Sequence, residues 1–153
     1  MNRAQRRANP TSWASTIAAS RTMAPALAVE IMTKLHSAFH DLRNGSIDDE
    51  LFERVAASIN VGIVRAEQID ELCVAPMLAM RDALIRCDEI RGRHGRYGFD
   101  GSGLQAMADG LDVYEEMVRK STPNQMRAAM SISIARMQRQ VAAENAQEQP
   151  PWN

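Results

Sequence analysis

The chain is poor in cysteine and glycine. Its 153 residues include only two cysteines and eight glycines. Cys73 and Cys87 fall in one predicted helix, where a rise of about 1.5 Å per residue places them roughly 21 Å apart. A disulfide cannot span that distance, and no CxxC pair is present to indicate a zinc or redox site. Two separate thiols predict a packing role in a reducing compartment, so we expect a cytoplasmic protein.

Long hydrophobic runs are also absent. The longest, VAPMLAM at residues 74–80, is far shorter than the about 20 residues that a membrane-spanning helix needs. We therefore expect no membrane partner. A chain of this length can bury a core without disulfides or metals. We predict a flexible basic arm over residues 1–10, a single helical domain over 11–144 and a flexible tail over 145–153.

Apolar residues recur every three or four positions, which predicts an all-α bundle of about five to six helices joined by short loops. No segment of useful length has the alternation of a strand. The expected elements are a short helix at 11–19, stripes at 27–42 and 51–59, a bend at 60–62, a long helix ending near residue 91, and stripes at 104–118 and 126–141.

Short polar motifs predict where several of these helices begin and end. Asn44 and Gly45 indicate a left-handed stop, and Ser46 is the expected cap of the next helix. Ser102, with Gln105 three residues later, has the spacing of a capping box. The segment Thr122–Gln125 repeats that start signal.

Five of the eight glycines are concentrated in GRHGRYGFDGSG, residues 92–103. The order of the glycines does not match GxGxxG, which also needs a preceding strand, and no GK[ST] follows to make a nucleotide-binding loop. In one interpretation the Gly-rich loop at 92–101 is a connector, in which Gly92 or Gly95 ends the long helix in a left-handed turn.

The residues between these glycines support a second interpretation. A cationic and aromatic loop can grip phosphates and stack on unpaired bases. The residues that would do so here are Arg93, His94, Arg96, Tyr97 and Phe99. Both interpretations stay open at this point, and the same five residues are candidates for contact with a protein partner.

Charge is segregated along the chain, although the net charge is only −1. Residues 41–89 contain eleven acids and five bases, whereas residues 117–143 contain five bases and no acid. Arg3, Arg6 and Arg7 of the N-terminal arm could join Arg93 and Arg96 on one face that binds nucleic acid. Alternatively, the acidic middle pairs with the basic ends within the fold or across a dimer.

The residues do not suggest a metal site, a cofactor or a catalytic centre. His36 and His40 have the i, i+4 spacing of an HExxH zinc helix, but the motif here is HSAFH and lacks the glutamate. The only other histidine is His94. No nucleophile elbow or paired-acid signature is present. We therefore predict no metal, no cofactor and no enzymatic activity.

Methionine is the one residue type that is unexpectedly frequent, with ten in the chain. Met126, Met130 and Met137 share one face of the last helix with Ile134 and Val141. Methionine at helical spacing is most often core, and we expect core here. Its unbranched side chain also suits a docking or dimer surface, which is the alternative.

Two stretches, MNRAQRRA at the N-terminus and RYGFDGSGLQAMADGLDVYEEMVRKSTPNQM at 96–126, resemble small helical proteins of unassigned function encoded by proteobacteria, their prophages and plasmids. The resemblance covers about residues 60–130 and implies a bacterial or phage cytoplasmic setting. Many compact phage proteins work by binding and blocking host machinery. We predict a regulator or inhibitor that binds another protein, or a copy of itself, through the Met-rich helix or the glycine loop. The alternative is a nucleic-acid-binding accessory protein.

Overall fold

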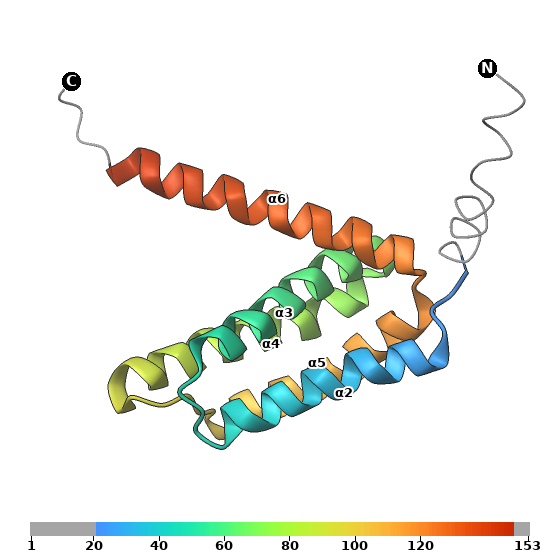
Figure 1. Ribbon diagram of the computed structural model, residues 1–153. Coiled ribbons are helices and arrows are strands. Elements are labelled where there is room, and N and C mark those ends of the chain that lie inside the picture. The colour runs from blue at the N-terminus through green and yellow to red at the C-terminus, as the bar shows by residue number, and fades with distance from the viewer. Residues whose placement is uncertain (1–20, 149–153) are drawn as a thin grey trace, which may run out of the picture.

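The computed structural model describes residues 21–148, which form an all-α bundle with five helices and no strand (Figure 1). The helices are α2 (Pro25–Arg43), α3 (Asp49–Ile69), α4 (Glu71–His94), α5 (Gly101–Lys120) and α6 (Pro123–Glu148). The predicted all-α class is confirmed. The predicted arm at 1–10, the helix at 11–19 and the last five tail residues lie outside the described residues. Within the described part, no helix has the length and apolarity to cross a membrane.

The core lies between α2, α3, α4 and α5, and α3 contacts each of the other four helices. Its largest fully buried apolar side chains are Leu42, Val55, Ile59, Met77, Met80, Cys87, Met107 and Val118. Methionine fills much of this core, as its flexible side chain allows. Helix α6 crosses the outside of α3, and its C-terminal end projects away from the bundle (Figure 1).

Helix α3 is continuous through residues 60–62, so the predicted bend there is wrong. Gly62 is inside the helix, and a Cβ added to it would lie 2.7 Å from the Tyr114 ring. The glycine therefore serves the close packing of α3 on α5 rather than a break. The break comes instead at Asp70, which has extended backbone angles and whose Oδ1 accepts a hydrogen bond from Leu72 N at 2.9 Å.

Aspartates rather than the predicted serines cap α3 and α5. Asp48 caps α3 by accepting from Leu51 N at 3.1 Å, and Asp100 caps α5 by accepting from Gly103 N at 2.6 Å. The predicted caps, Ser46 and Ser102, lie beside them and bind Asp48 N and the Asp100 carboxylate. A carboxylate is favoured at a helix N-terminus because its charge also complements the helix dipole.

The start of α6 is the capping box that the sequence predicts. Thr122 Oγ1 accepts a hydrogen bond from Gln125 N at 3.1 Å, and Gln125 Oε1 accepts one from Thr122 N at 2.9 Å. The helix continues to Glu148, four residues beyond its expected end. Residues 145–148 of the predicted flexible tail are therefore helical, because neither glycine nor proline interrupts the chain before Pro150.

Candidate functional site

The glycine-rich segment is a short connection between two helices. Helix α4 runs through Gly92 and His94, and Gly95 ends it with a φ of +77°, donating from its N–H to Arg91 O at 2.8 Å. Of the two predicted stops, Gly95 is therefore the actual one. The chain then passes against the α2–α3 turn, where Tyr97 N donates to Ser46 O at 2.9 Å.

The aromatic side chains of this connection point into the fold. Tyr97 is 4% exposed and stacks on Phe52, with ring centroids 4.7 Å apart. Phe99 is partly buried and packs edge-on against Phe39 at 5.3 Å. Neither ring therefore stands free in solvent, although both line the pocket beside the loop. The physical reason is that two aromatic rings gain more by burial against the bundle than by standing in water.

A polar cluster fixes Tyr97 in this position. Its Oη donates to Asp49 Oδ1 at 2.7 Å, and the Arg91 guanidinium lies 5.6 Å from the centre of its ring. Arg91 also donates to Gly95 O at 2.7 Å. Burial, together with the Asp49 carboxylate, raises the pKa of Tyr97 to about 12. Tyr97 therefore remains a neutral donor that ties the loop to the start of α3.

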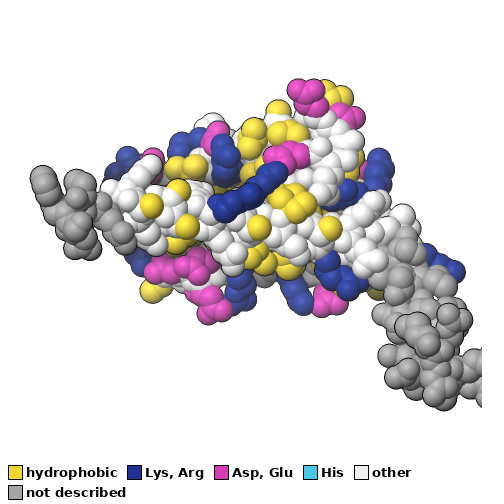
Figure 2. All heavy atoms as spheres, turned by 90° about the horizontal axis from the view of Figure 1, so that it is seen from above, with side chains coloured by type: hydrophobic (Ala, Val, Ile, Leu, Met, Phe, Trp, Pro, Cys, Tyr) yellow, Lys and Arg dark blue, Asp and Glu magenta, His cyan; other side chains and the backbone are white. Residues whose placement is uncertain are grey.

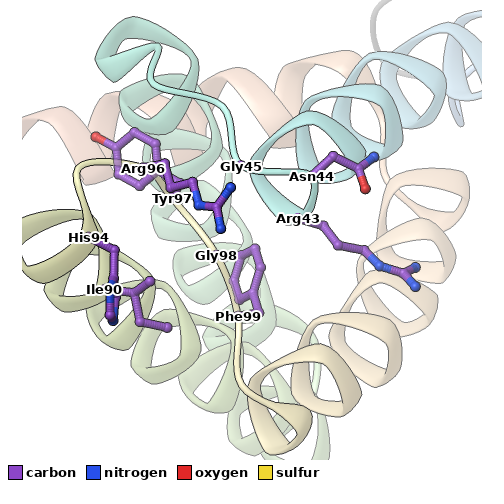
Figure 3. Close-up of a pocket in the computed structure, with 9 residues that line it drawn as sticks. All are labelled: Arg43, Asn44, Gly45, Ile90, His94, Arg96, Tyr97, Gly98 and Phe99. Carbon is purple, nitrogen blue, oxygen red and sulfur yellow. The ribbon is translucent and has the colours of Figure 1, made fainter.

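His94 and Arg96 are exposed and line a pocket (Figure 3), whose wall also includes Tyr97 and Phe99, whereas Arg93 is exposed and does not line it. This pocket has a volume of about 420 Å³ and lies where the loop meets the α2–α3 turn. Arg43 from the end of α2 joins His94 and Arg96 in its wall, and no acidic residue lines it. No acid of the described residues lies within 4.0 Å of the Arg43, Arg93 or Arg96 guanidinium. Arg43 was not among the predicted site residues, because no local motif shows that residues about 50 positions apart share a pocket.

The histidines do not form a metal site. His36 and His40 line one surface depression along α2, whereas His94 lines the pocket beside the glycine loop. His40 Nε2 is 2.8 Å from Asn44 Nδ2. Among residues 21–148, no three His, Cys, Asp or Glu side chains are close enough together to hold a metal ion.

The apolar stripe of α6 is exposed rather than buried. The exposed fractions are 50% for Met130, 45% for Ile134, 48% for Met137 and 50% for Val141. The preferred expectation that this methionine face is core is therefore wrong for Met130 and Met137, while Met126 packs partly against α3. The reason is that α6 turns a different face, with Ala129 and Ser133, toward α3. Figure 2 looks down on α6 and shows hydrophobic side chains exposed along it.

Helix α6 is held to the bundle mainly near its N-terminal end. Ala129 packs on Val61 and Val64 of α3. One turn beyond Ser133, the Arg136 guanidinium makes two hydrogen bonds, of 3.1 and 2.7 Å, to the Glu67 carboxylate. This ion pair joins the acidic middle of the chain to its basic end, as one of the two charge interpretations expects. From Ile134 to Glu148 every residue of α6 is exposed.

Cys73 and Cys87 both lie on α4 and are free thiols, as predicted. Cys87 is fully buried in the core, and burial raises its pKa to about 11. A thiol with a raised pKa is a poor nucleophile, so Cys87 serves packing.

Comparisons with protein-family models, with curated proteins and with solved structures find no match to this chain. Arg3, Arg6 and Arg7 lie outside the described residues. The described residues thus offer two candidate binding surfaces, which are the exposed stripe of α6 and the basic pocket beside the glycine loop.

Proposed function

We propose that this protein is a non-enzymatic binding protein whose helix α6 docks an apolar helix of another protein. The stripe of Met130, Ile134, Met137 and Val141 carries the proposal, since each of these side chains is about half exposed on a helix that packs along one side only. Apolar side chains spaced by four, three and four residues form the seam of a two-helix coiled coil. From Ile134 to Glu148 every residue of α6 is exposed, and Arg136, paired with Glu67 of α3, ties this part of the helix to the bundle.

Covering this stripe would contribute a substantial favourable free energy to association. Fully burying one such side chain contributes about 1.5–3 kcal/mol, so covering the exposed half of four of them contributes roughly 3–6 kcal/mol. An isolated helical segment is marginally stable in water without tertiary packing. A partner helix would therefore also stabilise the C-terminal half of α6.

The charges of α6 indicate the chemistry of its partner. The positions beside the stripe, Ser131, Gln138 and Gln140, are uncharged, so they allow another apolar seam to approach. Arg127, three residues before Met130 and so on a neighbouring part of the helix surface, has no acid of the described residues within ion-pair distance. A partner helix with an apolar seam and an acidic side chain near Arg127 fits this pattern best. The resemblance to small phage and plasmid proteins supports a role as a regulator or inhibitor of the bound protein.

Substitution on opposite sides of α6 tests the proposal. A photocrosslinking amino acid at position 137, but not at position 132, should capture the partner in the native host. Ile134→Glu with Met137→Glu should then weaken binding of the purified partner by about 100-fold or more in calorimetry, equal to about 2.7 kcal/mol. Ile132→Glu is the matched control, because Ile132 is 37% exposed on another face of the same helix.

Two results would decide the partner's identity or reject the proposal. A wild-type dimer in light scattering that the double substitution dissociates would identify the partner as a second copy of the chain. Equal affinity of the stripe variant and the wild-type protein for the captured partner would exclude α6 as the docking surface.

The basic pocket supports nucleic-acid binding as a second candidate function. Arg43, His94 and Arg96 line it without an acid, and Arg93 is exposed one residue before His94 in α4. Because Tyr97 and Phe99 are packed inward, recognition there would rest on phosphate contacts. Anisotropy titrations with single-stranded DNA and RNA should show binding that weakens steeply with salt, and Arg93→Ala with Arg96→Ala should reduce that slope. No binding at low salt would remove this candidate.

A further inference from the structure

A second apolar surface of the molecule is a groove between α2 and α3, away from α6. Its volume is about 750 Å³, within the range of about 300–1,000 Å³ that is usual for ligand pockets. Apolar side chains line it on both sides, among them Ile31, Leu35 and Ala38 from α2 and Leu51 and Val55 from α3. No residue of α6 lines the groove, so the site is independent of the proposed docking stripe.

Tyr114 of α5 contributes the unusual feature of this groove. Its side chain is only 4% exposed and lines the groove from the third helix. Gly62 leaves space for its ring, since a Cβ there would lie 2.7 Å from two of the ring carbons, and Met77 packs nearby. The close packing therefore holds the ring in one position.

The Tyr114 hydroxyl has no hydrogen-bond partner among the described residues. No described donor or acceptor pairs with it, and the only sealed, unpaired side-chain atom of the described part is Arg91 Nε. Tyr114 lines the groove, so the groove is the space from which an acceptor could reach this hydroxyl. Buried polar groups in proteins are nearly always paired with protein, water or a ligand. A donor left free at the base of an apolar groove is suited to an incoming acceptor.

The charges around the groove disfavour an anion. Lys34 and Arg54 are paired with Glu30 and Glu50 at 2.7 and 3.0 Å, so neither is a free counter-charge, and the Asp41 carboxylate in the groove lining would repel a negative group. Burial raises the pKa of Tyr114 to about 12, which keeps its hydroxyl neutral. An ionised group placed at the base would lose its hydration without compensation.

We propose that the α2–α3 groove binds a neutral, largely apolar small molecule that places a carbonyl oxygen on the Tyr114 hydroxyl. The apolar walls supply most of the binding free energy, and the Tyr114 hydroxyl supplies orientation. This arrangement, apolar walls with a fixed polar group that orients the ligand, is typical of small-molecule sites.

A pair of probes that differ in one carbonyl group tests this site on the full chain. 2-Acetylnaphthalene and 2-ethylnaphthalene have similar shapes, but only the ketone can accept a hydrogen bond. The wild-type protein should bind the ketone about 3–10-fold more tightly, the range expected for one neutral hydrogen bond. In methyl NMR spectra, both probes should shift the signals of Ile31, Leu35 and Val55.

Tyr114→Phe should remove the preference for the ketone and leave the affinity for the hydrocarbon unchanged. Because the hydroxyl has no described partner, this variant should fold normally, which thermal unfolding checks. Tyr97→Phe is the matched control, since it removes the chain's other phenol outside the groove and should retain the preference. The proposal is overturned if neither probe shifts the groove methyls up to its solubility limit, or if Tyr114→Phe still prefers the ketone.

Discussion

At the scale of single residues, the space around each helical glycine decides what that glycine contributes. Gly92 is inside α4, and an added Cβ would meet no atom within 4 Å. Gly62 is inside α3, where the added Cβ would meet the Tyr114 ring at 2.7 Å and Met77 Sδ at 3.0 Å. Gly92 therefore only adds flexibility to the unfolded chain, whereas Gly62 is required for close packing.

Alanine at these two positions should have opposite effects. Gly92→Ala should raise the free energy of unfolding by about 0.5–1 kcal/mol, because alanine restricts the unfolded chain and favours the helix. Gly62→Ala should lower it by about 1–3 kcal/mol, because the methyl group displaces the ring packed against it. Urea denaturation followed by circular dichroism measures both changes. Shifts of the same sign would contradict this account of the α3–α5 contact.

At the scale of elements, α6 differs from the other helices in how it is held. Its capping box, Ala129 and Ser133 fix its first turns, and the Arg136–Glu67 ion pair is the last described tertiary contact along it. An ion pair between partly exposed side chains contributes little to global stability, about 0–1 kcal/mol. Its effect should instead be local, on the orientation of the exposed stripe.

Removing this ion pair should loosen α6 without unfolding the bundle. Arg136→Ala should change the global free energy of unfolding by less than about 1 kcal/mol, while amide hydrogen exchange from residue 137 onward becomes faster. Arg139→Ala, which lacks an ion pair among the described residues, is the control and should leave exchange unchanged. Equal exchange in both variants would show that the ion pair does not hold the helix.

At the scale of the whole molecule, one buried thiol and two buried phenols with raised pKa values make the free energy of unfolding depend on pH in the alkaline range. Burial raises the pKa of Cys87 to about 11 and those of Tyr97 and Tyr114 to about 12. In the unfolded chain these groups titrate at their ordinary values of 9.0 and 10.0. Above pH 9 the folded protein therefore holds more protons than the unfolded chain.

The free energy of unfolding should consequently be largest below pH 9 and should fall as pH rises toward 12. Urea midpoints at pH 8, 9, 10 and 11 measure this decline, and absorbance at 295 nm should show that the chain's two tyrosines titrate late in the folded state. Tyr114→Phe should make the decline less steep, because it removes one of the three groups. A midpoint that is constant up to pH 11 would be inconsistent with burial of these groups.

Local sequence patterns were sufficient to predict several helices, but not the sites built from separate helices. Helical spacing and the Thr122–Gln125 capping box predicted α2, α5 and the start of α6. The bend expected at Gly62 was wrong, because the tyrosine that packs on that glycine is about 50 residues away in the chain. The pocket at Arg43 and Arg96 and the groove at Tyr114 were not predictable for the same reason, since each is built from separate helices.

The sequence by itself determined that this protein is a bundle of amphipathic helices, because apolar spacing, prolines and caps act within a few residues of one another. Only the tertiary structure decided which apolar faces are buried. Met107 and Met130 both lie on regular helical stripes, yet one is fully buried and the other is 50% exposed. The physical reason is that burial depends on the presence of a facing helix, and α6 contacts the bundle with Ala129 and Ser133, leaving Met130 and Met137 toward solvent.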